Sequence, residues 1–160
     1  MNRTTNTMKI RDGIELGSGK PVLFSGPCAV ESFDICLEIG TKVKAWAEEH
    51  GFSYVFKASF DKANRTSSSS FRSIGMDASL EVLQRVGKAL DVPLVTDIHE
   101  SYQAAEVAEV VDVLQIPAFL CRQTDLLLAA AATGKAVKIK RGQFMAPEDM
   151  AYAVSKVRAA

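Results

Sequence analysis

The sequence predicts an α/β fold built on a parallel sheet. Short runs of β-branched and aromatic residues alternate with longer stretches of helical periodicity, in about five successive units. Right-handed crossovers would join such strands, either in a closed barrel or in an open doubly wound sheet, and the pattern does not choose between the two. The 160 residues, 48% of them apolar, suffice for one well-cored domain over residues 1–160. A complete eight-unit barrel typically needs about 250 residues.

A small hairpin is predicted near the start, at about residues 8–17. The segments 8–11 and 14–16 flank Asp12 and Gly13, a turn pair that allows positive φ at both central positions. The five strands of the parallel sheet are then expected at 22–26, 53–59, 93–98, 111–116 and 136–140.

Two helices between these strands show stripes expected to face the core. The first stripe is Ile35, Ile39, Val43 and Trp46, and the second is Leu80, Leu83, Val86 and Leu90. Ser32, Asp77 and Ser101 are predicted N-caps, and Pro147 followed by two acidic residues predicts the first turn of a last helix.

Charge and hydropathy exclude several classes of partner. The 19 basic residues cancel the 19 acidic ones, so no global positive field favours nucleic acid or an anionic membrane. No apolar run approaches the roughly 20 residues that span a bilayer, and the polar start at residues 1–7 lacks a signal-peptide core. We therefore expect a cytoplasmic protein without a nucleic-acid or membrane partner.

Basic residues follow the second strand. Lys57, Lys62 and Arg65, with Asn64 and Thr66, form a set suited to phosphate or carboxylate groups. A solvated basic loop is the alternative, but Lys57 lies in an apolar run where an unpaired ammonium would be costly. The segment 60–76 is also longer than most ordinary loops, which favours a functional role.

The fifth strand carries two lysines of the same parity. Lys138 and Lys140 share one face while Val137 and Ile139 share the other. If the aliphatic face packs on the helices, both lysines point to the lumen, whereas on an edge strand they would face water. Gln143 follows as a neutral donor and acceptor.

Two further strand ends carry polar groups. Asp97 and His99 have the same parity after the third strand, and Gln115 and Arg122 flank an apolar turn after the fourth. Singly, each has a structural explanation, such as a buried aspartate paired with a lysine. Together they predict a site, because a parallel core gains nothing from unpartnered charges.

The three cysteines are an odd number without a Cys-x-x-Cys pair, which argues against a disulfide framework or a closed zinc site. Cys36 and Cys121 are expected in the core. Cys28, at the end of the first strand, is either a core thiol or a ligand of a divalent metal, and spacing alone establishes no metal site.

Five segments resemble the 3-deoxy-D-manno-octulosonate-8-phosphate synthase family. They are GPCAVES at 26–32, KASFDKANR at 57–65, TDIHE at 96–100, QIPAFLCRQTDL at 115–126 and KRGQF at 140–144. The related heptulosonate-phosphate synthases usually show Lys-Pro-Arg where this chain has Lys-Ala-Asn-Arg at 62–65, so Asn64 favours the octulosonate branch. The resemblance implies a TIM (β/α)₈ barrel with an N-terminal hairpin, usually tetrameric, of which this chain carries about the first five βα units.

The resemblance also implies an activity. That family condenses phosphoenolpyruvate with D-arabinose 5-phosphate, releasing phosphate, for lipopolysaccharide biosynthesis. It implies that phosphoenolpyruvate is held by Lys57, Lys62, Arg122, Lys140 and Gln143, and the sugar phosphate by Asn64, Arg65 and Thr66. We add Gln115 to the expected substrate ligands and name Lys62, Asn64, Asp97 and His99 as catalytic candidates.

A cysteine at position 28 resembles the metal-dependent branch of the family, so a divalent metal is implied there. The histidine, glutamate and aspartate that complete that metal site in the family, and a phosphate-binding arginine, are expected beyond Ala160. The chain departs from the family at Thr66, Ser69, Ser73 and Lys138, where serine, histidine, glycine and asparagine are usual.

Two alternatives to an octulosonate synthase remain. One is a heptulosonate synthase, which would prefer erythrose 4-phosphate. The other is a half-barrel that binds phosphorylated ligands without catalysis. For the 160 residues alone we expect no phosphate release, because five of eight strands leave two open sheet edges and half a site.

Overall fold

The computed structural model describes residues 7–160 and contains two sheets. Strands β1 (Met8–Arg11) and β2 (Ile14–Leu16) pair antiparallel. The second sheet is parallel, in the order β3-β4-β5-β6-β7, with strands β3 (Val22–Ser25), β4 (Ser53–Lys57), β5 (Leu94–Asp97), β6 (Val113–Ile116) and β7 (Ala136–Ile139). Residues 1–6, which make up most of the polar start, lie outside the described residues.

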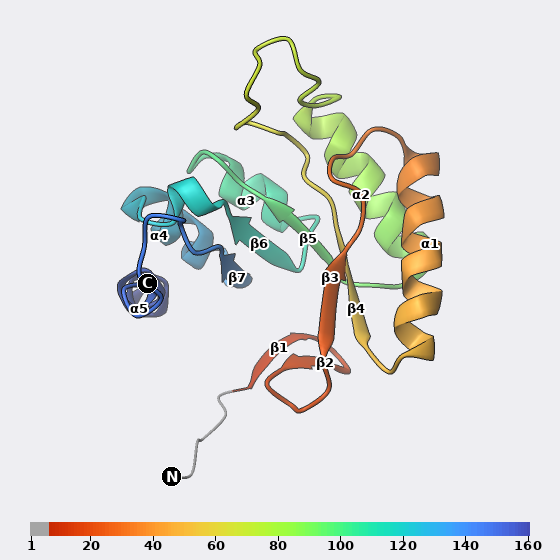
Figure 1. Ribbon diagram of the computed structural model, residues 1–160, viewed down its shortest axis with the longest axis horizontal. Coiled ribbons are helices and arrows are strands. Elements are labelled where there is room, and N and C mark those ends of the chain that lie inside the picture. The colour runs from red at the N-terminus through yellow and green to blue at the C-terminus, as the bar shows by residue number, and fades with distance from the viewer. Residues whose placement is uncertain (1–6) are drawn as a thin grey trace.

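A helix follows every strand of the parallel sheet. The helices are α1 (Phe33–Glu49), α2 (Met76–Leu90), α3 (Gln103–Ala108), α4 (Thr124–Ala132) and α5 (Met150–Ala159), and a short 3₁₀ turn, Ala118–Leu120, follows β6. Each strand pairs with the strand of the next βα unit, in the order in which they follow in the chain. The sheet is curled, and the helices lie on its outer side (Figure 1). The fold class is confirmed: five βα units of a TIM-type barrel with an N-terminal hairpin.

The hairpin lies where it was predicted, but its turn differs. Gly13 has a φ of 79°, whereas Asp12 does not take a positive φ, so the expectation of positive φ at both positions is wrong. The strand register shifts between Lys9 and Arg11, which accommodates a turn with a single left-handed residue. Figure 1 shows the hairpin at one end of the sheet and the long loop after β4 at the opposite end.

The five parallel strands are confirmed, each a residue or two shorter than predicted. The core face of α1 is a correction. Val43 packs partly buried against the core as predicted and Ile39 is half-buried, but Ile35 and Trp46 are 41% and 48% exposed. The fully buried residues of the helix are Cys36, Gly40 and Ala47. Small residues occupy this face because α1 packs closely against α2. A Cβ on Gly40 would lie 2.5 Å from a methyl group of Leu90. The second stripe, on α2, is buried as predicted.

The helix starts agree with the sequence only in part. Ser32 caps α1, and its hydroxyl accepts from the backbone N–H of Ile35 at 3.3 Å. Asp77 is not the N-cap of α2, because the helix begins at Met76 and its N-cap is Gly75. Ser101 precedes the N-cap of α3, which is Tyr102. Pro147 lies in a turn just before α5.

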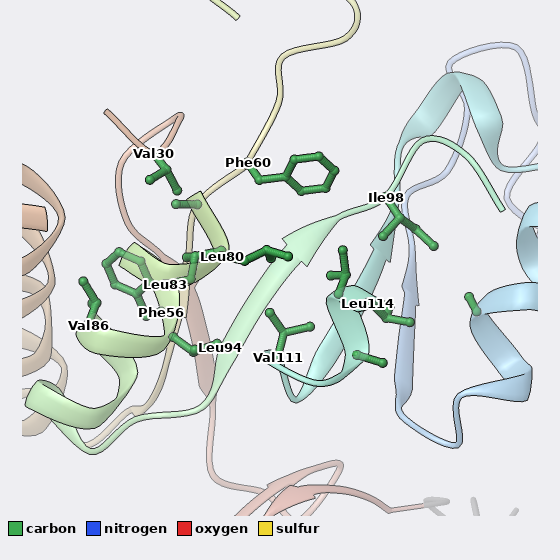
Figure 2. Packing of buried hydrophobic residues seen from close by; sticks show 14 of the residues in the cluster. Val30, Phe56, Phe60, Leu80, Leu83, Val86, Leu94, Ile98, Val111 and Leu114 are labelled. Atoms are coloured by element: carbon green, nitrogen blue, oxygen red, sulfur yellow. The ribbon is translucent and has the colours of Figure 1, made fainter. Parts of the chain in front are cut away.

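The core has two parts, on the two faces of the parallel sheet. The larger part lies between the sheet and the helices, where Figure 2 shows Phe56, Leu83 and Val86 beside α2. A smaller cluster on the inner face of the sheet includes Val55 and Val95. Cys36 and Cys121 are buried, as expected. Among residues 7–160, no helix is both long and apolar enough to cross a membrane.

Alternation along the strands turns this inner face into a site. Each inward valine lies two residues before a polar side chain, so Val55, Val95 and Val113 are followed by Lys57, Asp97 and Gln115. The register brings the polar residues together, because Asp97 pairs with Gln115 and Gln115 with Lys138. An apolar inner layer therefore gives way to a polar one at the carboxyl ends of the strands.

Candidate active site

A cleft of about 390 Å³ opens at the carboxyl ends of β4 to β7. It is lined by most of the candidate residues, which come from separate strand ends and loops: Lys57, Lys62, Asn64, Asp97, His99, Gln115, Lys140 and Gln143. Parallel α/β folds place their sites at this end of the sheet. The convergence of these side chains is the geometry that an anion-binding site needs.

Four candidates lie outside the lining of this cleft. Arg122 departs from the expectation of one common cavity, because it lines a separate cavity of about 250 Å³ with Tyr152 and Lys156 of α5. Arg65 is exposed and its Nε donates to the carbonyl of Phe71 at 3.1 Å. Thr66 and Cys28 are exposed.

Ser59 was not among the candidates, yet it is central to the cleft. The ammonium groups of Lys57 and Lys62 both donate to its hydroxyl, each at 2.8 Å. Ser59 is 1% exposed, because its backbone pairs with Ala29 beside β3. A buried hydroxyl therefore holds two like charges close together. The only signal for Ser59 in the sequence was its place between the two lysines.

Lys57 has an altered affinity for protons. The pKa of Lys57 is lowered to about 8, chiefly by burial and in smaller part by the charges of Lys62 and Lys140. Asp97 opposes this shift, as does the thiol of Cys28. A bound anion would favour the charged form of the lysine, so the cleft is electrostatically suited to accept one.

Asp97 and His99 form a buried pair beside Lys57. His99 Nε2 lies 3.3 Å from Asp97 Oδ2, and the two side chains are only 12% and 11% exposed. Burial alone would raise the pKa of Asp97, but hydrogen bonds from His99 and Ser59 and the charge of Lys57 outweigh it, so the pKa is lowered. Within residues 7–160, Asp97 Oδ1 and His99 Nδ1 are buried without a hydrogen-bond partner. This pair therefore keeps unused hydrogen-bonding capacity directly behind the cleft that both residues line.

The loop after β4 is tied down at its base. The guanidinium of Arg72 donates to both carboxylate oxygens of Asp61, from Nε to Oδ1 at 3.1 Å and from Nη2 to Oδ2 at 2.5 Å. The backbone N–H of Lys62 donates to the carbonyl of Arg72 at 3.0 Å. The Ser73 hydroxyl donates to the carbonyl of Phe60 at 2.5 Å. Ser73, where glycine is usual in the resembling family, thus helps to fix the start of the loop that carries Lys62 and Asn64 to the cleft.

Lys138 lies outside the lining of the cleft and lines a separate apolar pocket with Phe24 and Val113. Its ammonium is 4.6 Å from the centre of the Phe24 ring, in a cation–π contact. Burial and the neighbouring Lys140 lower the pKa of Lys138. Lys138 adds positive potential beneath the cleft without lining it.

The described residues do not form a metal site by themselves. Among residues 7–160, no group of three or more histidine, cysteine, aspartate or glutamate side chains is arranged to hold a metal ion. Cys28 is therefore a lone candidate ligand, and Asp97 and His99 bind each other. What these residues can do chemically is hold a multiply charged anion with lysines, donate hydrogen bonds and move a proton.

Comparison with known proteins gives one family. The chain matches the DAHP synthetase I family over residues 4–160. It is 55% identical over 151 residues to a 2-dehydro-3-deoxyphosphooctonate aldolase of Cyanothece sp., covering 94% of this chain and 55% of that protein. The protein of the same name from Synechococcus sp. is 55% identical over 151 residues, covering 94% and 53%.

A third relative, from Francisella tularensis subsp. holarctica, carries the same name and is 51% identical over 152 residues, covering 94% of this chain and 55% of that protein. The chain thus spans about half the length of the curated relatives it matches.

Proposed function

Because the chain belongs to the DAHP synthetase I family, we propose that its cleft is the phosphoenolpyruvate-binding part of an octulosonate-phosphate synthase site. The whole protein would condense phosphoenolpyruvate with D-arabinose 5-phosphate to 3-deoxy-D-manno-octulosonate 8-phosphate and phosphate. The relatives' name, 2-dehydro-3-deoxyphosphooctonate aldolase, supports this reaction over others of the family.

The observation that carries the proposal is the convergence of three lysines on one cleft. Lys57, Lys62 and Lys140 come from two different strand ends and a loop, and all line the same 390 Å³ cleft. Two phosphorylated substrates repel each other, so their approach requires fixed positive charges in a site that excludes water. Gln115 and Gln143 add neutral donors that orient a carboxylate or phosphate without changing the charge.

The proposed reaction forms one carbon–carbon bond and one carbon–oxygen bond, and breaks another carbon–oxygen bond. C3 of phosphoenolpyruvate attacks the aldehyde carbon, water adds at C2 and gives up a proton, and the former aldehyde oxygen takes up a proton. The bond from C2 to the phosphate oxygen then breaks, and the C2 hydroxyl gives its proton to the departing phosphate and becomes the ketone. Lys62 and Asn64 would donate to the aldehyde oxygen as it gains negative charge. The Asp97–His99 pair would hold and move a proton, since both residues line the cleft and Nε2 lies 3.3 Å from Asp97 Oδ2. Arg65 and Thr66 would bind the sugar phosphate from the loop.

The role of a metal is a separate proposal. We propose Cys28 as one thiolate ligand of a divalent cation whose other ligands come from outside these 160 residues. Such an ion would act as a Lewis acid on the aldehyde. The described residues do not complete its site, so none of the steps above depends on it.

Titration of phosphoenolpyruvate into the 160-residue polypeptide tests the binding half of the proposal. We expect saturable binding measured by calorimetry, and no phosphate release when arabinose 5-phosphate is added. A chain of the relatives' full length is expected to release phosphate with arabinose 5-phosphate, and a chelator to abolish that release. Absence of phosphoenolpyruvate binding to the folded polypeptide would refute the proposed site.

The same assay separates the alternatives. A heptulosonate synthase would release phosphate faster with erythrose 4-phosphate than with arabinose 5-phosphate. A module that only binds ligands would bind phosphoenolpyruvate in every form of the chain and yield no product with either sugar.

Proton uptake is expected when phosphoenolpyruvate binds above about pH 8. The pKa of free Lys57 is lowered to about 8, and the bound anion raises it, so binding draws up to about one proton between pH 8 and 10. Calorimetry in buffers of different ionisation enthalpy measures this uptake. Lys57→Met should remove it, and an uptake that persists in that variant would show that another group is responsible.

The lowered pKa of Lys57 also determines how this residue makes the stability of the fold depend on pH. Because the folded pKa of Lys57 lies below the unfolded value of 10.5, burial of this lysine opposes folding below pH 8. That opposition fades as pH rises from 8 through 10.5, where the unfolded chain also loses the proton. The contribution of Lys57 to stability therefore increases with pH across this window.

A further inference from the structure

The turn between β5 and α3 is organised by one buried side chain. Gln103, the first residue of α3, is 8% exposed. Its Oε1 accepts from the backbone N–H of His99 at 2.8 Å and from that of Glu100 at 3.1 Å. The backbone N–H of Gln103 donates to the carbonyl of Glu100 at 3.1 Å. Side chain and backbone of this one residue therefore close the turn that lines the cleft.

These two N–H groups have lost the partners that a strand would provide. β5 ends at Asp97, so the amides of His99 and Glu100 lie outside the strand pairing. Partly buried amides left without an acceptor are costly, and one carbonyl oxygen with two lone pairs can satisfy both. The side chain of Gln103 is thus the specific reason why the backbone keeps this course.

The course of the backbone decides where the His99 ring points. Nε2 lies 3.3 Å from Asp97 Oδ2, and the ring meets Phe60 edge-on with centroids 5.6 Å apart. Nδ1 is buried and has no hydrogen-bond partner in the part of the chain that the structure describes. In a neutral imidazole one nitrogen donates and the other accepts, so the short distance from Nε2 to the Asp97 carboxylate favours the tautomer with the proton on Nε2.

We propose that Gln103 is a positioning residue for the Asp97–His99 pair. By accepting two successive amides, it holds His99 so that Nε2 faces the Asp97 carboxylate and Nδ1 keeps its acceptor lone pair without a partner among residues 7–160. The geometry stands without any assumed activity, and its importance for catalysis rests on the proposed function.

The test compares two substitutions of similar size. Gln103→Glu keeps an oxygen acceptor at the same place, whereas Gln103→Met keeps the length and removes it. Gln84→Met, at an exposed position of α2, is the matched control. The chain has only two histidines, so His99 is readily told apart from His50 by NMR.

Two readouts report on positioning rather than on stability alone. The imidazole ¹⁵N shifts, at a pH where the ring is neutral, show which nitrogen carries the proton. Amide hydrogen exchange measures protection at His99 and Glu100. In Gln103→Met we expect exchange at both amides to accelerate by about five- to tenfold and the preference for protonated Nε2 to be lost. Gln103→Glu and Gln84→Met should keep both properties.

Several results would overturn the proposal. These are an unchanged tautomer and unchanged exchange in Gln103→Met, or failure of Gln103→Glu to behave like the unmodified chain. Should Gln103→Met not fold, the unmodified chain decides: unprotected amides at His99 and Glu100, or a proton on Nδ1, would refute the proposal. Phosphoenolpyruvate titration keeps the two proposals apart, because a chain that does not bind it but keeps the His99 tautomer contradicts only the proposed function.

Discussion

Replacing Lys62 with methionine is expected to weaken phosphoenolpyruvate binding by about a hundredfold, measured by calorimetry. A charge-assisted hydrogen bond is worth about 1.5 to 3 kcal/mol, and Lys62 offers its ammonium at the centre of the cleft, 2.8 Å from the Ser59 hydroxyl. Methionine keeps the length of the side chain and removes the charge. The loss should therefore be in binding, with little change in the fold.

The same substitution is also expected to change the pKa of Lys57. The charge of Lys62 helps to lower the pKa of Lys57, so its removal should raise that pKa from about 8. The proton uptake that accompanies binding would then move to higher pH. This coupled change shows that the two lysines act on one another and not only on the ligand.

Lys20→Met is the matched control for Lys62→Met. Lys20 is exposed and precedes β3, at the end of the sheet opposite the cleft, so its loss changes the net charge by the same amount. Binding within about threefold of the unmodified chain is expected, because a distant surface charge is screened by salt. Equal losses in the two variants would mean that overall charge, not a site, attracts the ligand.

Much of the site could be predicted from alternation along parallel strands. Lys57, Asp97, Gln115 and Lys140 share the inward parity of their strands, and neighbouring parallel strands end at the same edge of the sheet. These two rules need no knowledge of packing. They placed side chains far apart in the chain around one cleft.

What depended on packing could not be predicted. The apolar stripe of α1 was assigned to Ile35, Ile39, Val43 and Trp46, but the two ends of that stripe are exposed and small residues such as Gly40 meet α2. Ser59 and Gln103 act through hydrogen bonds whose partners are fixed only by the folded backbone. Arg122 follows the turn after β6, and alternation along a strand does not predict where a side chain beyond a turn points. Arg122 therefore lines another cavity.

Replacing Gly26 with alanine is expected to lower the free energy of unfolding by about 3 kcal/mol, the upper part of the usual range for overpacking. A Cβ at this position would lie 2.3 Å from the carbonyl oxygen of Lys57 and 3.1 Å from its carbonyl carbon. The atoms in the way belong to the backbone of β4, which is paired on both sides and cannot rotate away like a side chain. Denaturant unfolding measures the loss.

Gly134→Ala separates this clash from ordinary glycine strain. Gly134 has a φ of 71°, and a Cβ added there would meet no atom within 4 Å, so alanine should cost only about 1 to 2 kcal/mol through the left-handed backbone. Gly26 lies at the point where the chain leaves β3 against Lys57, so relief of its clash must move the backbone that carries this lysine. Weakened phosphoenolpyruvate binding by the folded protein is therefore expected in Gly26→Ala and not in Gly134→Ala. Equal stability losses with intact binding in both variants would mean that the close approach of Gly26 does not control the cleft.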